Sequence, residues 1–448
     1  MKAIFSLWAA ALLAGSTIWG APVLMISIDG MRPDAVTHAA EHGLKVPNLQ
    51  RFMKEGVYAT GVTGVVPTIT FPSHTTLVTG VWPAQHGIYS NNTFDPFSET
   101  QRFWYWRDIR VPTLWQAADQ AGIVTASVNW PVTVAAKPVR YLIPEYWRAR
   151  NPEDRKLLEA LTRPADFLTE LEAKLGDYTN GDDTTVHGDE IRTKFAIEIL
   201  SRVKPGFMTL HLTALDETQH ESAPFSAESN ATLEALDGMV GRLTAAALAN
   251  DANAVVAVVS DHGFARTDVR VNLTLPFIEQ GFIKPGANSG AGPTWDAAPW
   301  PAGPGIAVIL HQPEASGTKA RVKAMLDKLA ANPEYGIARV LDGAEVARMG
   351  GFPDAAYFVE LKLGYALGTG ASGPASGPMV TPVPGTGQHG YLPDRPEMRS
   401  AFFLLGRGLA TSQDLGIIDM RQVAPTLAAI LGVKLPSAAM GPIVVTRR

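Results

Sequence analysis

The chain has 448 residues, enough for two domains or for one large domain with an insertion, and its composition, 46% hydrophobic and 18% charged, is that of a globular protein. Its net charge of -5 and the lack of a basic run exclude a surface built to bind duplex nucleic acid, which needs clustered lysine and arginine. It contains no cysteine, so no disulfide framework stabilises the fold.

The N-terminal segment has the pattern of a secretory signal. Lys2 is followed by an apolar run from 3 to 14 and then by small and polar residues. This run is too short to span a bilayer, so we expect residues 1–21 to be a signal peptide that is cleaved near Gly20 or Ala21. A membrane anchor that is retained is the alternative. On the first interpretation the mature protein is periplasmic or secreted and has no stable membrane span.

Three apolar, β-branched segments each end in acidic residues. They are 23–30, 206–216 and 254–263, and helical patterns separate them. Short apolar strands that alternate with amphipathic helices predict an α/β fold with a mostly parallel central sheet and helices on both faces. Ligands of such sheets bind beyond the carboxyl ends of the strands, so these acidic residues are the first candidates for a site.

The pattern of predicted elements and the composition change between residues 267 and 385. This region holds a helical pattern, two strand-like segments and a stretch rich in Gly, Pro and Ser near 368–387. We therefore predict a catalytic core formed by 22–266 and 386–448. A smaller inserted α+β subdomain is predicted at 267–385, returning to the core through a mobile loop.

Two short motifs place aspartate and histidine together. Asp216 and His220 are four residues apart after the second strand, so a helix would place both side chains on one face, although a solvated helix face explains the pair as well. Asp261 and His262 end the third strand, where a buried aspartate needs a partner. A capping aspartate beside a packed histidine is the alternative there.

Asp29 and His389 are less specific when each is taken alone. Asp29 ends the first strand before a glycine and would also suit a helix cap, and His389 lies in a loop where the chain re-enters the core. Together, three aspartates and three histidines come from four segments that the sheet would bring to one edge. Mixed Asp and His ligands suit zinc, and six are too many for one four-coordinate ion, so we expect two zinc ions.

A pair of metal ions favours displacement at phosphorus. It would also lower the pKa of a threonine hydroxyl, which is otherwise inert at neutral pH. This makes Thr70, in the hydroxyl-rich segment 65–80, a candidate nucleophile. The structural alternative, that Thr70 caps the helix that follows, is compatible with this role.

Several motifs occur in a specific order, namely ISIDGMRPD, PTITFPSHTTLVTGVWPAQHGIYSN, LDETQHESAP, VVSDHGF and GQHGY. As a set they resemble the bacterial nucleotide pyrophosphatase/phosphodiesterases of the alkaline phosphatase superfamily. The resemblance covers about 22–266 and 386–448 and implies an alkaline phosphatase-like core that holds two zinc ions.

The resemblance also implies a role for each site residue. Thr70 matches the nucleophile, and Asn91 matches the amide that binds a phosphate oxygen together with the backbone N–H after the nucleophile. Phe71 matches an aromatic on which the nucleotide base stacks, and Tyr178 or Tyr146 is predicted as the second. Asp216, His220 and His389 match the ligands of the substrate-side zinc, and Asp29, Asp261 and His262, with Thr70, match those of the other.

These matches imply a hydrolase that cleaves nucleotide phosphodiester or phosphoanhydride bonds through a phospho-threonine intermediate and releases a nucleoside 5′-monophosphate. A sulfatase is excluded because the chain lacks the C/S-x-P-x-R motif of its nucleophile. Diester substrates are favoured over monoesters, because no arginine occurs between Arg51 and Arg102 to neutralise a second phosphate charge. A glycerophosphodiester phosphodiesterase and a periplasmic metal- or phosphate-binding protein are further alternatives, and the sequence leaves the oligomeric state open.

Overall fold

The computed structural model describes residues 20–96, 104–146, 152–180, 184–284, 294–368 and 377–446. Nearly all of the predicted signal peptide, and part of the predicted Gly/Pro-rich loop, therefore lie outside the described residues. In the part of the chain that is described, no helix combines the length and the apolar character needed to cross a membrane.

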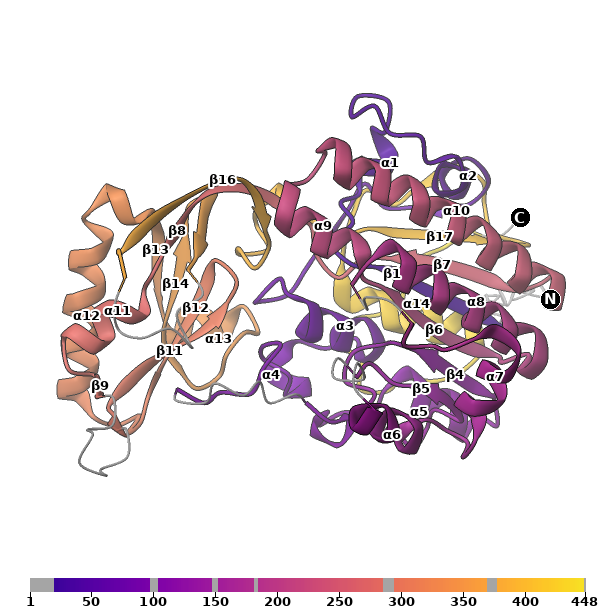
Figure 1. The fold of residues 1–448 in the computed structure, drawn as a ribbon, viewed down its shortest axis with the longest axis horizontal. Coiled ribbons are helices and arrows are strands. Elements are labelled where there is room, and N and C mark those ends of the chain that lie inside the picture. The colour runs from indigo at the N-terminus through magenta and orange to yellow at the C-terminus, as the bar shows by residue number, and fades with distance from the viewer. Residues whose placement is uncertain are drawn as a thin grey trace, which may run out of the picture.

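An eight-stranded sheet forms the centre of the larger part of the molecule (Figure 1). Its order is β18-β2-β17-β7-β1-β6-β4-β5, and only β17 runs antiparallel to its neighbours. The strands are β1 (Val23–Ile28), β2 (Val57–Tyr58), β4 (Thr125–Val128), β5 (Tyr141–Ile143), β6 (Phe207–Leu212), β7 (Val255–Val259), β17 (Phe402–Gly406) and β18 (Gln413–Asp414).

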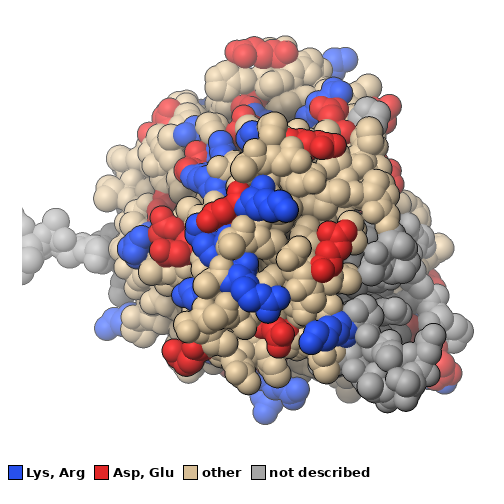
Figure 2. Space-filling view, turned by 90° about the vertical axis from the view of Figure 1, so that its left-hand side faces the viewer, with Lys and Arg blue, Asp and Glu red and all other residues tan. Residues whose placement is uncertain are grey.

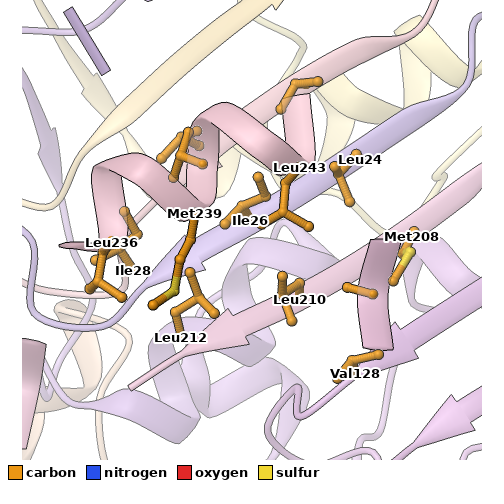
Figure 3. Packing of buried hydrophobic residues seen from close by; sticks show 14 of the residues in the cluster. Leu24, Ile26, Ile28, Val128, Met208, Leu210, Leu212, Leu236, Met239 and Leu243 are labelled. Atoms are coloured by element: carbon orange, nitrogen blue, oxygen red, sulfur yellow. The ribbon is translucent and has the colours of Figure 1, made fainter. Parts of the chain in front are cut away.

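The middle strands are buried on both faces, which explains their nearly continuous apolar sequences. Every residue of β1 is buried, and its side chains alternate between two cores: Leu24, Ile26 and Ile28 face the first, whereas Val23 and Met25 face the second. Figure 3 shows the first core, where leucine and methionine side chains of helix α10 pack on β1 and β6. Truncating one such side chain to alanine costs about 2–5 kcal/mol, because the neighbours only partly fill the cavity.

Helices cover both faces of this sheet, so the predicted α/β fold is confirmed. The capping box of α5 shows how local sequence starts a helix: Thr113 accepts the N–H of Gln116, whose side chain accepts the N–H of Thr113. The first core is covered by α1 (Asp34–Thr37), α2 (Pro47–Glu55), α6 (Pro152–Leu161), α7 (Phe167–Leu175), α8 (Val186–Val203) and α10 (Ala227–Asn250), and the second by α3 (Thr70–Thr79), α5 (Leu114–Gln120) and α14 (Val423–Leu431).

A second, four-stranded antiparallel sheet lies at the left of Figure 1, in the order β11-β12-β14-β13. Helices α11 and α12 pack on one of its faces. The opposite face packs on Val66, Ile69 and Tyr89 of the larger part. The predicted limits of the inserted subdomain, 267–385, stay a prediction. The elements are β11 (Ala297–Ala302), β12 (Gly305–Leu310), β13 (Ile337–Asp342), β14 (Ala355–Leu361), α11 (Thr274–Glu279), α12 (Ser316–Ala330) and α13 (Gly343–Arg348).

A three-stranded ribbon connects the two sheets. The chain leaves the larger sheet through β8 (Ala265–Val271) and returns through β16 (Val380–Gln388), which runs antiparallel to it, while β15 (Gly364–Leu367) pairs with the other edge of β8. Gln388 lies opposite Ala265. The residues that directly follow β7 and the residue that follows β16 are therefore neighbours.

The end of the molecule formed by the second sheet carries both signs of charge (Figure 2). On α12, for example, Lys323 Nζ lies 2.7 Å from Asp327 Oδ1. Interspersed charges of this kind make a solvated surface, and exposed pairs add little stability. This face therefore lacks the one-sided positive field that a nucleic-acid surface would need.

Candidate active site

Three neighbouring strands deliver the predicted ligands to one edge of the central sheet. β7, β1 and β6 lie side by side and parallel, so their carboxyl ends meet. Asp29 follows β1, Asp261 and His262 follow β7, and helix α9 (Ala214–Ser222), which carries Asp216 and His220, begins after β6. This edge is where an α/β sheet binds its ligands.

Asp29, Asp261 and His262 form the first candidate metal group. One ligand atom from each lies within 4.8 Å of the others, and all three residues are buried. His262 Nε2 is 3.3 Å from Asp29 Oδ1 and 3.0 Å from Asp261 Oδ2. The other oxygen of each carboxylate has a partner outside the metal group. Asp29 Oδ2 lies 2.9 Å from His211 Nε2, and Asp261 Oδ1 accepts the N–H of Gly30 at 3.1 Å. One oxygen of each aspartate is thus left for the group.

Asp216, His220 and His389 form the second candidate metal group, again with ligand atoms within 4.8 Å of one another. Asp216 and His220 are one turn apart on α9, and Asp216 Oδ2 lies 3.3 Å from His220 Nε2. Asp216 Oδ1 lies 3.4 Å from His389 Nε2. The pairing of β8 with β16 brings His389 to this place, which explains how a residue so late in the chain joins the site.

The carboxylate of Asp189 fixes the start of α9. Asp189 Oδ2 accepts the backbone N–H groups of Thr213 and Ala214 at 2.9 and 2.8 Å. The buried carboxylate of Asp189 is paired with Arg192, whose Nη1 lies 2.6 Å from its Oδ1. The helix that carries two predicted ligands is therefore anchored at its first turn.

The three histidines of the two groups share one orientation. In each, Nδ1 lies next to a backbone carbonyl, which can only accept a hydrogen bond, so Nδ1 carries the proton and Nε2 offers its lone pair to the group. The carbonyl partners are those of Gly387 for His220 at 3.2 Å, Gly263 for His262 at 3.1 Å and Thr68 for His389 at 3.2 Å. This is the tautomer that a metal ligand needs.

The two groups adjoin each other and make one site. The rings of His262 and His389, one from each group, are stacked with centroids 3.6 Å apart and planes 6° apart. The buried ring of Phe264 packs edge-on against His220 at 4.9 Å and lies 5.1 Å from His389. The apolar ring of Phe264 therefore covers one side of these two histidines.

The charges at the site fit bound cations. Burial, and next the carboxylate of Asp261, raise the pKa of Asp29 well above its ordinary value. Burial also opposes the ionisation of Asp216, but His220 and then His389 lower its pKa to about 2. Burial, and next His262, lower the pKa of His389 to about 3. Asp216 is thus an ionised carboxylate and His389 a neutral imidazole, whereas ionisation of Asp29 is disfavoured. Burial opposes the protonation of His220, but the carboxylate of Asp216 raises its pKa.

Unsatisfied atoms point to the same conclusion. Within the two candidate metal groups, four buried atoms have no hydrogen-bond partner among the described residues, namely Asp29 Oδ1, Asp216 Oδ1, Asp261 Oδ2 and His262 Nε2. Buried polar atoms without partners are costly, and a metal ion in each group would satisfy all four. The donor set, carboxylate and imidazole, is one that zinc accepts.

Thr70 and Asn91 meet beside the first group. Thr70 begins α3, and His74 one turn later has its Nδ1 2.9 Å from the carbonyl of Thr70 and 3.5 Å from Asp261 Oδ2. Asn91 Oδ1 accepts the backbone N–H of Phe71 at 2.9 Å. A hydroxyl, an amide and a backbone N–H therefore gather at the N-terminal end of a helix, where the helix dipole favours an anion.

The two predicted stacking aromatics lie in different environments. Phe71 is buried with Ile88 and Val132, with Trp104 packed at the edge of this cluster. Tyr178 instead packs edge-on against Phe195 in the first core, with ring centroids 5.0 Å apart. Neighbours cover the rings of both Phe71 and Tyr178, and their roles in base stacking stay predictions. Tyr146 also packs on the first core.

From the sequence, His211 and His74 are expected to be structural residues near the site, and both contact the first group. His211 lies opposite Ser27 in the pairing of β6 with β1, and His74 Nε2 lies 2.8 Å from Ser27 Oγ. The signal that identifies His211 is the period of two along β6, where Leu210 and Leu212 face the first core and His211 must face the other side.

A family model described as type I phosphodiesterase / nucleotide pyrophosphatase matches residues 23–343. Human ectonucleotide pyrophosphatase/phosphodiesterase family member 1 is 25% identical over 235 residues, which are 50% of this chain and 21% of that protein. Bis(5'-adenosyl)-triphosphatase enpp4 of Xenopus laevis is 34% identical over 116 residues, 24% of either chain. The chain spans less than a quarter of the length of these two relatives.

Solved structures match over nearly the whole chain. Murine ectonucleotide pyrophosphatase/phosphodiesterase 5, as an inactive variant in complex with AMP, has a TM-score of 0.64 at 19% identity, with 95% of this chain and 97% of that chain covered. The human protein has the same TM-score at 18% identity, with 94% and 96% covered. These likenesses show the fold, and a bacterial origin stays a prediction. Since the family model matches well over half of its residues, the chain belongs to the type I phosphodiesterase / nucleotide pyrophosphatase family.

Proposed function

We propose that the chain is a di-zinc hydrolase that cleaves nucleotide phosphodiester or phosphoanhydride bonds and releases a nucleoside 5′-monophosphate. The observation that carries the proposal is the meeting of two Asp/His groups beside the helix that begins with Thr70. The names of the relatives and the AMP complex of the murine protein support a nucleotide substrate. The N-terminal sequence pattern supports a periplasmic or secreted location.

The ligand sets follow from the two groups. Asp29, Asp261 and His262, together with Thr70, would hold one zinc ion. Asp216, His220 and His389 would hold the other. When bound, a pair of zinc ions supplies positive charge that stabilises the attacking and leaving oxygens of a displacement at phosphorus.

The residues of the chain then perform two displacements. Thr70 Oγ1 attacks phosphorus, so a phospho-threonine bond forms as the bond to the leaving group breaks. Water then cleaves the phospho-threonine bond, which releases the nucleoside monophosphate and restores the hydroxyl. The N–H group of the Asn91 amide binds a non-bridging oxygen, where negative charge grows in the transition state, while its Oδ1 stays bonded to the N–H of Phe71. We also propose that the ring of Phe71 stacks on the base.

The charges around the site support a diester substrate. Among the described residues, no lysine or arginine forms an ion pair with the carboxylates of Asp29, Asp216 or Asp261. Asn91, at the phosphate-binding end of α3, is neutral. A phosphomonoester carries a second negative charge that needs such a cation, whereas a diester does not.

The test is metal content together with initial rates on the p-nitrophenyl ester of thymidine 5′-monophosphate and on p-nitrophenyl phosphate. We expect about two zinc ions per chain and a strong preference for the diester. A preference for the monoester would keep the metal groups but overturn the charge argument. Bound metal without turnover of either compound would indicate a binding protein and overturn the proposal.

A further inference from the structure

Two tryptophan side chains donate hydrogen bonds to the Asn91 segment, residues 89–94. Trp104 Nε1 donates to the carbonyl of Ser90 at 2.7 Å, and Trp300 Nε1 donates to the carbonyl of Asn92 at 3.2 Å. The carbonyl groups of the two residues that flank Asn91 are thus each bonded to an indole. In addition, Ser90 Oγ donates to the carbonyl of Pro301 at 3.2 Å.

Ring packing repeats this arrangement. Tyr89 lies between the two indoles, edge-on to Trp104 at 6.4 Å and to Trp300 at 6.2 Å. Phe94, at the other end of the segment, is 5.4 Å from Trp300. Aromatic pairs at such distances stabilise the packing beyond the area they bury. Both ends of the segment are therefore packed, and its middle is hydrogen-bonded.

The two tryptophans come from different parts of the fold. Trp104 packs beside the cluster that contains Phe71, whereas Trp300 lies on β11 of the second sheet. The second sheet supplies none of the six predicted metal ligands. Its contact with the Asn91 segment is therefore a route by which it can act on the site without touching substrate.

We propose that Trp104 and Trp300 are positioning residues that hold Asn91 with its amide at the N-terminal end of α3. This inference rests on the proposed phosphodiesterase function and on the role of Asn91 in it. Asn91 Oδ1 already accepts the N–H of Phe71, so the amide must keep one orientation to present its N–H group to a phosphate oxygen. A shift of about 1 Å at such a donor costs up to a hundredfold in rate, which is why a held backbone matters here.

A double-mutant cycle tests the proposal. Trp300→Phe keeps a ring but removes the N–H that bonds to Asn92. We expect it to lower kcat roughly three- to tenfold on the thymidine diester, the scale of one lost hydrogen bond, with KM nearly unchanged. In an Asn91→Ala background the same change should cause no further loss, since it acts through the amide that is already gone.

The matched control is Trp295→Phe. Trp295 packs on Phe94 at 5.4 Å in the same aromatic cluster but donates no hydrogen bond to Ser90 or Asn92. We expect wild-type kinetics from it. Equal losses from Trp300→Phe in the wild-type and Asn91→Ala backgrounds, or no loss at all, would overturn the inference.

Hydrogen exchange separates a failure of the inference from a failure of the proposed function. A peptide that covers residues 89–94 should exchange faster in Trp300→Phe than in the wild type and in Trp295→Phe. If the wild type does not cleave the diester, the proposed function fails. The hydrogen-exchange rates of residues 89–94 in the wild type and in Trp300→Phe then still show whether the tryptophan holds the segment. Unchanged exchange in Trp300→Phe would overturn the inference even in an active enzyme.

Discussion

Replacing His86 with asparagine should make the protein lose less stability than the wild type when the pH falls into the mildly acidic range. His86 ends the short helix α4 (Pro83–His86) and is fully buried. Its Nδ1 accepts the backbone N–H of Ile88 at 3.1 Å, and its Nε2 lies 3.1 Å from Thr76 Oγ1, which donates its own proton to the carbonyl of Val81. The neutral ring satisfies both contacts, whereas a proton on Nδ1 would face the N–H of Ile88.

The magnitude follows from the pKa. Burial lowers the pKa of His86 from its ordinary value of 6.5 to about 3. Between these values the unfolded chain binds a proton that the native protein does not, so this residue's stabilisation is complete above pH 6.5 and is lost as the pH falls. Each pH unit in this window costs about 1.4 kcal/mol, so moving from neutral pH to about pH 5 removes about 2 kcal/mol.

Urea unfolding near pH 7.5 and pH 5 measures this difference, with a chelator present so that metal binding does not contribute. The wild type and the control His187→Asn, at an exposed position on α8, should lose about 2 kcal/mol more on acidification than His86→Asn. A lower stability of His86→Asn at both pH values does not affect the test, because only the change in the free energy of unfolding with pH is compared. The same loss in all three proteins would refute the reasoning.

Three further substitutions test the site. Thr70→Ala should abolish diester cleavage while its metal content after dialysis stays unchanged. The control Thr79→Ala, in the same helix, should keep activity. Loss of metal from Thr70→Ala would contradict the role of Thr70 as the nucleophile. Asn91→Ala should lower kcat about a hundredfold, the scale of one oxyanion-hole donor, and unchanged kinetics would remove it from the site. Asp216→Asn should lower bound metal from about two ions to about one, because it removes one ligand of three, and full content would contradict the assigned group.

The metal groups could be predicted because their residues sit where regular structure ends. Asp29 and Asp261 close buried apolar strands, and parallel strands bring such ends together. The spacing of Asp216 and His220 matches one helical turn, which the structure has on α9. His389 needed the family resemblance, because only the pairing of β16 with β8 brings it to the other ligands.

Contacts between distant segments could not be predicted in the same way. The hold of Trp300 on the Asn91 segment depends on how the second sheet packs against the first, and no local pattern encodes that packing. A buried tyrosine and a substrate-binding tyrosine also look alike in sequence. The sequence therefore could not show that the ring of Tyr178 packs on Phe195 in the first core.

The place of β17 in the central sheet has a consequence for the order in which the protein can fold during synthesis. β2 is made early, but its neighbours in the sheet are β17 and β18, which come from the last part of the chain. His389 is made late as well. A growing chain therefore cannot complete either the sheet or the second metal group until these segments have left the ribosome. Such long-range pairing is slow, so catalytic competence should arise only after β17, β18 and His389 have emerged.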